Sequence, residues 1–184
     1  LRPGAEAVTV VTPTGRVALE HEHRGVWVGV LPGATVPDYS IDVTYGGTIV
    51  PADDPYRFWP TLGEIDLHLI GEGRHEQLWQ VMGAHVRSYE TAIGVVSGVS
   101  FAVWAPNATS VSVVGDFNRW DGRCHPMRKH MPSGFWELFI PGLKEGDLYK
   151  FQIRYHDQVF EKADLQAGPE RTIDAADLRR GEAR

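Results

Sequence analysis

The 184-residue sequence contains a single cysteine, Cys124, so it cannot form a disulfide within the chain. It also has no apolar run approaching the roughly 20 residues that a membrane-spanning helix needs. Basic residues are outnumbered by acidic ones, 18 to 24, which gives a formal net charge of -6. This balance argues against the basic surface that nucleic-acid binding requires. A single cysteine fits a reducing compartment, and we expect a cytoplasmic protein.

Several catalytic motifs are missing as well. The sequence has no P-loop, no dinucleotide-binding glycine fingerprint and no G-x-S-x-G nucleophile turn. Carboxylates for glycosidic chemistry would have to converge to about 5–10 Å, and nothing in the spacing of the acidic residues pairs them. We therefore expect no catalytic residue and no cofactor. The first residues, "LRPGAEAVTV", lack a methionine and a signal-peptide pattern, so we expect the chain to begin inside a longer gene product.

Two patterns of histidine and cysteine residues are candidates for a metal or nucleophile site. His21 and His23 would share one face of a strand and could bind zinc, but no third ligand follows from the spacing. Cys124 and His125 are adjacent, so on a strand their side chains would point apart, and no third group orients them. Surface or turn positions are the simpler interpretation, and we expect no metal site.

The chain is patterned mostly as β-structure. "YSIDVTY" (39–45) and "LYKFQIRY" (148–155) alternate between apolar and polar residues, which predicts strands with one buried and one exposed face. In the second stretch Tyr149, Phe151 and Tyr155 would point inward, while Lys150 would face solvent. Many short strands separated by Gly, Pro and Asp favour an all-β fold of two immunoglobulin-like β-sandwiches.

One segment between the β-rich halves has helical spacing. In "GRHEQLWQVMGAH" (73–85), Leu78, Val81 and Met82 lie at i, i+3 and i+4, and Gly83 is a plausible C-terminal stop. The chain is predicted to comprise an N-terminal sandwich at 1–72, a helical connector at 73–85, a second sandwich at 86–164 and a poorly ordered, charge-rich tail at 165–184.

The turn "VVGDFNRWDG" (113–122) contains two large rings where turns are normally polar. We expect Phe117 to anchor this turn to the core. Trp120 either folds back over the sandwich or is exposed beside Asn118 and Lys150 as a surface on which a sugar ring could stack. The residues alone leave both possibilities open. Trp104 and Trp136 lie within predicted strands and are expected in the core.

Two longer stretches resemble a known family. "GVSFAVWAPNATSVSVVGDFNRWDG" (98–122) and "GFWELFIPGLKEGDLYKFQI" (134–153) resemble the carbohydrate-binding module family 48 sandwich, which precedes the catalytic barrel in α-glucan-active enzymes of the α-amylase superfamily. "YRFWPTLGEIDLHLIGEGRHEQLWQVMGAHV" (56–86) is similar to the junction in bacterial glycogen (1,4-α-glucan) branching enzymes. The likeness covers roughly residues 7–164.

The resemblance implies a non-catalytic N-terminal portion of an enzyme that forms α-1,6 branches, since a catalytic barrel needs about 250 residues. Trp120 and Lys150 match glucose-contacting residues of glycogen-binding members, and Asn118 and Phe160 are further candidates. A second tryptophan is expected near the last hairpin, where this chain has Val159 and Phe160. The implied partners are α-glucan, bound weakly, and the catalytic barrel.

Two other functions stay open. Both sandwiches could brace the barrel as structural domains without glucan affinity, or they could belong to a related debranching enzyme or trehalohydrolase. The branching-like junction at 56–86 argues against the latter. Without the barrel, the two domains would expose apolar surface, and we expect self-association.

Overall fold

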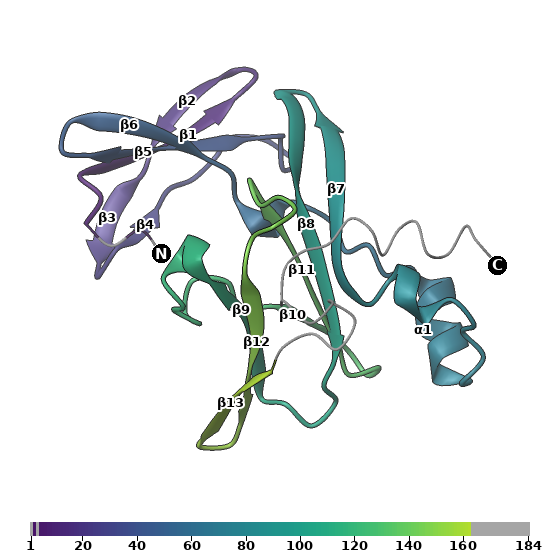
Figure 1. Ribbon diagram of the computed structural model, residues 1–184. Coiled ribbons are helices and arrows are strands. Elements are labelled where there is room, and N and C mark those ends of the chain that lie inside the picture. The colour runs from purple at the N-terminus through teal and green to yellow at the C-terminus, as the bar shows by residue number, and fades with distance from the viewer. Residues whose placement is uncertain (1, 3, 163–184) are drawn as a thin grey trace. The chain divides into compact units, whose positions relative to one another are not determined.

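The computed structural model describes residue 2 and residues 4–162, which form two compact units (Figure 1). The first comprises the residues up to Arg57 together with Tyr89–Val96. The second comprises Phe58–Ser88 and the described residues from Ser97 onward. The predicted all-β fold of two sandwich-like parts with one short helix is confirmed. The predicted tail at 165–184 lies outside the described residues.

The first unit is built on an antiparallel sheet with strand order β2-β1-β5-β6 and a separate β3-β4 hairpin. Its elements are β1 (Ala7–Thr12), β2 (Gly15–Ala18), β3 (Glu20–His23), β4 (Val26–Val28), β5 (Ser40–Tyr45), β6 (Thr48–Ala52) and the 3-10 turn η1 (Pro55–Arg57). Val8 pairs with Val43 in the register of β1 and β5, and both are buried. The alternation seen at 39–45 therefore marks a strand with a buried face.

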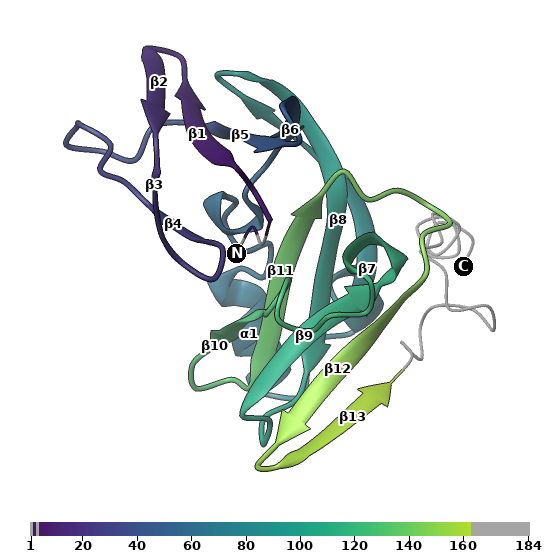
Figure 2. The ribbon, with the colours of Figure 1, turned by 90° about the vertical axis from the view of Figure 1, so that its left-hand side faces the viewer.

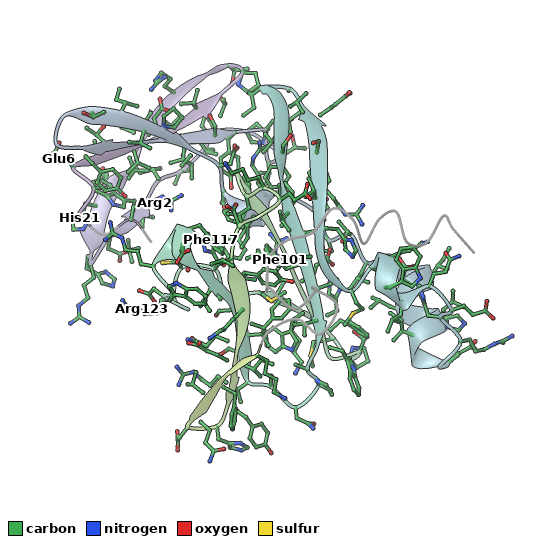
Figure 3. All side chains as sticks on the ribbon, viewed as in Figure 1. Arg2, Glu6, His21, Phe101, Phe117 and Arg123 are labelled. Carbon is green, nitrogen blue, oxygen red and sulfur yellow. The ribbon has the colours of Figure 1, made fainter. Side chains whose placement is uncertain are left out.

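The second unit contains two sheets, with strand orders β10-β11-β8-β7 and β13-β12-β9. Its strands are β7 (Gly83–Thr91), β8 (Gly94–Trp104), β9 (Ser110–Gly115), β10 (Arg128–His130), β11 (Phe135–Pro141), β12 (Tyr149–Tyr155) and β13 (Gln158–Lys162), the tip of the β7-β8 hairpin belonging to the first unit. Figure 2 shows β12 between β9 and β13. Phe101 of β8 meets Tyr149 and Phe151 of β12 edge to face, with ring centroids 4.9 and 6.3 Å apart. These contacts place the core between the two sheets (Figure 3).

A further layer covers the other face of the β11-β8 sheet. Ala102 and Phe135, neighbours in sequence of the core residues Phe101 and Trp136, form a second buried cluster with Leu62. The residues that pack on this cluster come from the segment that precedes β7: Leu67, Ile70, Val81 and Met82. Alternate residues of β8 and β11 are therefore buried on opposite faces.

The helix of this segment lies earlier than the sequence analysis predicted. The α-helix α1 spans Glu64–Gly71, whereas 73–85 contains only the 3-10 turn η2 (Leu78–Gln80) before β7 begins. At the start of α1, the Asp66 carboxylate accepts a hydrogen bond from the Gly63 N–H at 3.1 Å. At its end, Gly73 adopts a φ of +68°, which stops the helix. Val81 and Met82 are apolar because they pack on the sheet, so their spacing does not require a helix.

Two aromatic residues predicted in the core are exposed. Trp104 pairs with Phe135 in the register of β8 and β11, so it lies on the sheet face opposite the main core, and it is 58% exposed. Tyr155 ends β12 and is also exposed, because the strand extends beyond the core there. Trp136 is buried, as predicted, and its indole Nε1 donates to the Ala105 carbonyl at 2.9 Å.

One buried carboxylate ties the covering segment to the sheet. Glu137, in the middle of β11, is 3% exposed. Its Oε1 accepts hydrogen bonds from both the backbone N–H and the hydroxyl of Thr61. Its Oε2 accepts from the Leu62 N–H at 3.2 Å and from His130 Nε2 at 3.1 Å. A buried charge is tolerated where such donors satisfy it, so Glu137 fixes residues 61–62 on the strand.

Glu137→Ala should lower the free energy of unfolding of this unit by about 3 kcal/mol, because the donors around the carboxylate would stay buried without an acceptor. The matched control is Glu145→Ala, which removes an exposed glutamate in the loop between β11 and β12 and should change the value by less than about 0.5 kcal/mol. Urea unfolding followed by tryptophan fluorescence measures both. Equal midpoints for the two variants would contradict this role of Glu137.

Candidate functional site

The turn after β9 is fixed by a buried asparagine. Residues Asp116–Asn118 form a 3-10 turn, and the Asn118 side chain folds back onto the end of β9. Asn118 Oδ1 accepts from the Gly115 N–H at 3.0 Å, and its Nδ2 donates to the Val113 carbonyl at 2.8 Å. The same Nδ2 lies 2.9 Å from His125 Nδ1. These bonds occupy the amide, so Asn118 shapes the turn from inside.

Phe117 attaches the turn to the core, as the sequence predicted. Its ring packs against the main apolar cluster of the unit. Gly115 makes this possible, because a Cβ there would lie 2.2 Å from the Leu148 carbonyl oxygen and 2.4 Å from the Phe117 ring. The chain then turns through two residues with left-handed backbone, Arg119 at φ +56° and Trp120 at φ +59°. The turn geometry therefore directs Phe117 into the core and places Trp120 outside the main core.

Trp120 is half-buried and lies beside a lysine of the neighbouring strand. Its indole Nε1 donates to Asp116 Oδ1 at 2.8 Å, which holds the orientation of the ring. Lys150 Nζ lies over the indole, 5.4 Å from its centroid, in a cation–π arrangement. The same ammonium group donates to Glu161 Oε2 at 3.0 Å. The structure thus brings together Trp120 and Lys150, two of the four predicted site residues.

An open hollow of about 560 Å³ borders Trp120. It is lined by Ser110, Ser112, Arg119, Trp120, Asp121, Gly122, Arg123, Pro126, Gln152 and Arg154. The register of β9 and β12 pairs Ser112 with Gln152 and Ser110 with Arg154, so these side chains share one face of the sheet. The volume falls within the range of about 300–1,000 Å³ that is typical of small-molecule sites.

Asp121 and Arg123 form a local ion pair at the rim of this hollow (Figure 3 labels Arg123). Asp121 Oδ1 accepts from the backbone N–H and from Nε of Arg123, both at 2.9 Å, and Oδ2 accepts from Nη2 at 2.6 Å. The hydrogen bonds from Arg123 lower the pKa of the Asp121 carboxyl to about 2 from its ordinary 3.8, and they raise the pKa of the Arg123 guanidinium. Both groups of the pair, the Asp121 carboxylate and the Arg123 guanidinium, are therefore ionised at neutral pH.

Phe160, the fourth predicted site residue, lies on the other face of the sheet. It pairs with Ile153, whereas Val159 pairs with Arg154 and so shares the face of Gln152 and Lys150. On the face that carries the hollow, the described part of β13 therefore presents Val159 and Glu161, and neither is aromatic. Residues an even number of positions from Lys150 along β12 share its face of the sheet. The register of the β12-β13 hairpin then assigns Val159 to that face and Phe160 to the opposite one.

Four further residues line the hollow that were not predicted as site residues: Arg119, Arg123, Gln152 and Arg154. A signal for two of them was present, because 150, 152 and 154 alternate with the apolar residues of β12. The two turn arginines had no such signal, since a turn has no fixed period.

The histidine and cysteine patterns do not form a site within the part of the chain that the structure describes. His21 accepts a hydrogen bond from the Gly25 N–H at 3.3 Å and packs on Trp27 with ring centroids 4.9 Å apart. Cys124 is an exposed free thiol. Across residue 2 and residues 4–162, no three His, Cys, Asp or Glu side chains cluster as metal ligands would. No helix in these residues has the length and apolar character of a membrane span.

The fold and the aromatic turn define a β-sandwich accessory module, and comparison with known proteins gives its family. Residues 81–172 match carbohydrate-binding module 48 (isoamylase N-terminal domain), and the chain belongs to this family. Residues 1–56 match the N-terminal domain of the alpha-1,4-glucan branching enzyme GlgB. The resemblance to the N-terminal region of bacterial glycogen branching enzymes is confirmed.

The curated relatives are similar over most of this chain. It is 53% identical over 169 residues to the 1,4-alpha-glucan branching enzyme GlgB of Rhodococcus jostii (strain RHA1), covering 91% of this chain and 23% of that protein. It is 56% identical over 148 residues to the GlgB of Thermobifida fusca (strain YX), covering 79% and 20%. Among solved structures, pullulanase type I from Bacillus subtilis str. 168 complexed with maltose is 19% identical, with a TM-score of 0.34 over 88% of this chain and 21% of that one. The chain spans about a fifth of the length of the curated relatives.

Arg123→Ala should return the pKa of Asp121 from about 2 toward its ordinary 3.8, because the guanidinium that stabilises the carboxylate is removed. Since the folded-state pKa is the lower one, the pairing favours the folded state above about pH 4, and this contribution is lost as the pH falls toward 2. Carboxyl-carbon NMR titration measures the midpoint. Arg74→Ala, an exposed arginine paired with Glu72, is the control and should leave Asp121 unchanged. A midpoint near 3.8 in the unaltered protein would refute the assignment.

Proposed function

We propose that this chain is the α-glucan-binding N-terminal region of a 1,4-α-glucan branching enzyme, acting in the cytoplasm in glycogen biosynthesis. The observation that supports it most directly is Trp120, held at the edge of an open hollow with Lys150 over its ring. Family membership and the GlgB relatives support the same conclusion and favour a branching enzyme over a debranching enzyme or trehalohydrolase.

Sugar recognition follows from the chemistry of these two side chains. One face of a pyranose ring is a patch of C–H groups, which stacks on an indole, while the hydroxyls at its edge need hydrogen-bond partners. The Lys150 ammonium has three N–H donors, and one of them is engaged by Glu161. The remaining donors can bond sugar hydroxyls. The Trp120 ring is already oriented by Asp116, so little conformational entropy is lost on binding.

The proposed binding is weak because, among residue 2 and residues 4–162, Trp120 is the one aromatic side chain that borders the hollow. In β13, Val159 and Glu161 share the face of Lys150, and Phe160 lies on the other face. One stacking contact and a few exposed hydrogen bonds give modest affinity, which suits a module that acts beside a catalytic site. We place the cleavage and transfer of the α-1,4 chain in a catalytic barrel outside these residues, with this chain holding the polymer near it.

A second function, structural support of that barrel, is favoured by a separate observation. Trp104 and Met131 are 58% and 76% exposed, and the Trp104 indole donates to the Ser133 carbonyl at 3.2 Å, so both lie at the β10-β11 turn. Large apolar side chains exposed together are typical of interaction surfaces. We propose that this surface packs on the remainder of the enzyme, and that the two functions coexist.

Trp120→Ala should abolish the retardation of this chain in native gels that contain glycogen, because the stacking surface is lost. Lys150→Ala should weaken retardation by about tenfold in apparent Kd, the expected effect of a charged hydrogen bond. The matched control is Trp59→Ala, which removes an 85% exposed tryptophan elsewhere in the same unit and should keep wild-type mobility. If glycogen does not retard the unaltered chain, the glucan-binding function is wrong and the structural one stands.

The isolated chain should self-associate through the Trp104 and Met131 surface, since both side chains are more than half exposed in the part of the chain that the structure describes. Sedimentation velocity at increasing concentration should show a rising average mass, and a Trp104→Ser/Met131→Ser double variant should stay closer to the monomer. Ile49→Ser/Val50→Ser, which alters exposed apolar residues of the first unit, is the control. A clean monomer at high concentration would count against the proposed interaction surface.

A further inference from the structure

The hollow beside Trp120 carries an excess of positive charge. Its lining contains three guanidinium groups, those of Arg119, Arg123 and Arg154, but only one carboxylate, that of Asp121. The chain as a whole has a formal net charge of -6, so this concentration of arginine is opposite in sign to the rest of the protein. A local excess of one sign in a concave surface attracts ligands of the other sign.

Two of the three arginines are not engaged by acidic groups of residue 2 or residues 4–162. Arg123 is held by Asp121 through three of its nitrogen atoms, so this pair is close to neutral. Arg119 and Arg154 form no ion pair with any residue in the described part of the chain. Two guanidinium groups are therefore available to a ligand in the hollow.

These two arginines come from different elements that line the same hollow. Arg119 directly precedes Trp120 in the turn, and its left-handed backbone is part of the turn geometry. Arg154 lies on the outward face of β12, opposite Ser110 of β9. Further polar side chains in the hollow are Ser110, Ser112 and Gln152, whose carboxamide fills the space beside Gly122. Cationic donors, neutral donors and an aromatic ring thus border one cavity.

The chemistry that fits this combination is a phosphorylated sugar. A phosphate monoester has three terminal oxygens and up to two negative charges, and a guanidinium binds two of these oxygens through parallel N–H bonds. The aromatic ring next to them binds the apolar face of a sugar. A free inorganic phosphate would use the arginines but would gain nothing from the indole.

We propose that the hollow beside Trp120 binds a phosphate ester carried on a glucose residue of an α-glucan, with Arg119 and Arg154 as the phosphate ligands. This inference rests on the proposed glucan-binding function and adds a preference for phosphorylated regions of the polymer. The affinity of the chain for an α-glucan then increases with the phosphate content of that polymer.

The experiment compares untreated glycogen with glycogen from the same batch that has been chemically phosphorylated, by co-sedimentation with the unaltered chain. The expected Kd, expressed per accessible chain end, is about tenfold lower for the phosphorylated polymer, and the difference should shrink at high salt. In Arg119→Gln/Arg154→Gln the ratio of the two Kd values should fall to near one. Arg74→Gln/Lys144→Gln removes the same charge from exposed sites elsewhere and should keep the tenfold ratio.

Competition distinguishes the sources of the phosphate. Glucose 6-phosphate and inorganic phosphate should displace phosphorylated glycogen only at concentrations at least a hundredfold above that of the polymer's phosphate. Displacement by either one at equal concentration would overturn the assignment to a polymer-borne phosphate. Equal Kd values for the two glycogens in the unaltered chain would overturn the phosphate site but leave glucan binding intact. Failure to bind untreated glycogen would instead contradict the proposed function.

Discussion

The buried carboxylate of Glu137 is the interaction on which the organisation of the second unit depends. It binds the backbone of Thr61 and Leu62 and so holds the covering segment on the outer face of β11. As a result β11 is buried on both faces, one against this segment and one against the β9-β12 sheet. A strand that is packed on both faces is held rigidly. The β9-β12-β13 sheet, whose outer face carries the candidate site, packs directly on this strand.

The candidate site follows from that packing through the alternation of β12. Because Tyr149 and Phe151 are anchored against Phe101, the residues between and beyond them, Lys150 and Gln152, must face outward. The neighbouring turn is positioned in the same way, since Phe117 is inserted in the core and Asn118 is bonded to the end of β9. Each outward-facing side chain is thus located by a buried neighbour.

The sequence predicted those features that depend on a local period and missed those that depend on which face is covered. The alternation at 148–155 correctly placed Lys150 outward, and Phe117 was correctly assigned to the core. The predicted burial of Trp104 was wrong, and the helix of the connector lies earlier in the chain than 73–85, because the segment 58–82 adds a layer whose position no local pattern specifies. Once that layer is known, the glutamate inside the apolar run "FWELFIP" (135–141) marks its attachment point, since a charge there must meet donors.

The outward face of the β9-β12-β13 sheet, which carries Lys150, presents polar groups around the single ring of Trp120. A second ring opposite Trp120 would enclose a sugar between two apolar surfaces, but the described residues of β13 that share the face of Lys150 in register are Val159 and Glu161. Binding energy must then come from polar groups around a single ring. Such groups are directional, so they favour particular substituents on the sugar, whereas two stacked rings accept any pyranose of the right shape. In the proposed site, arginines in place of an aromatic wall would lower general affinity and raise selectivity, because the guanidinium groups gain most from a ligand that carries charge.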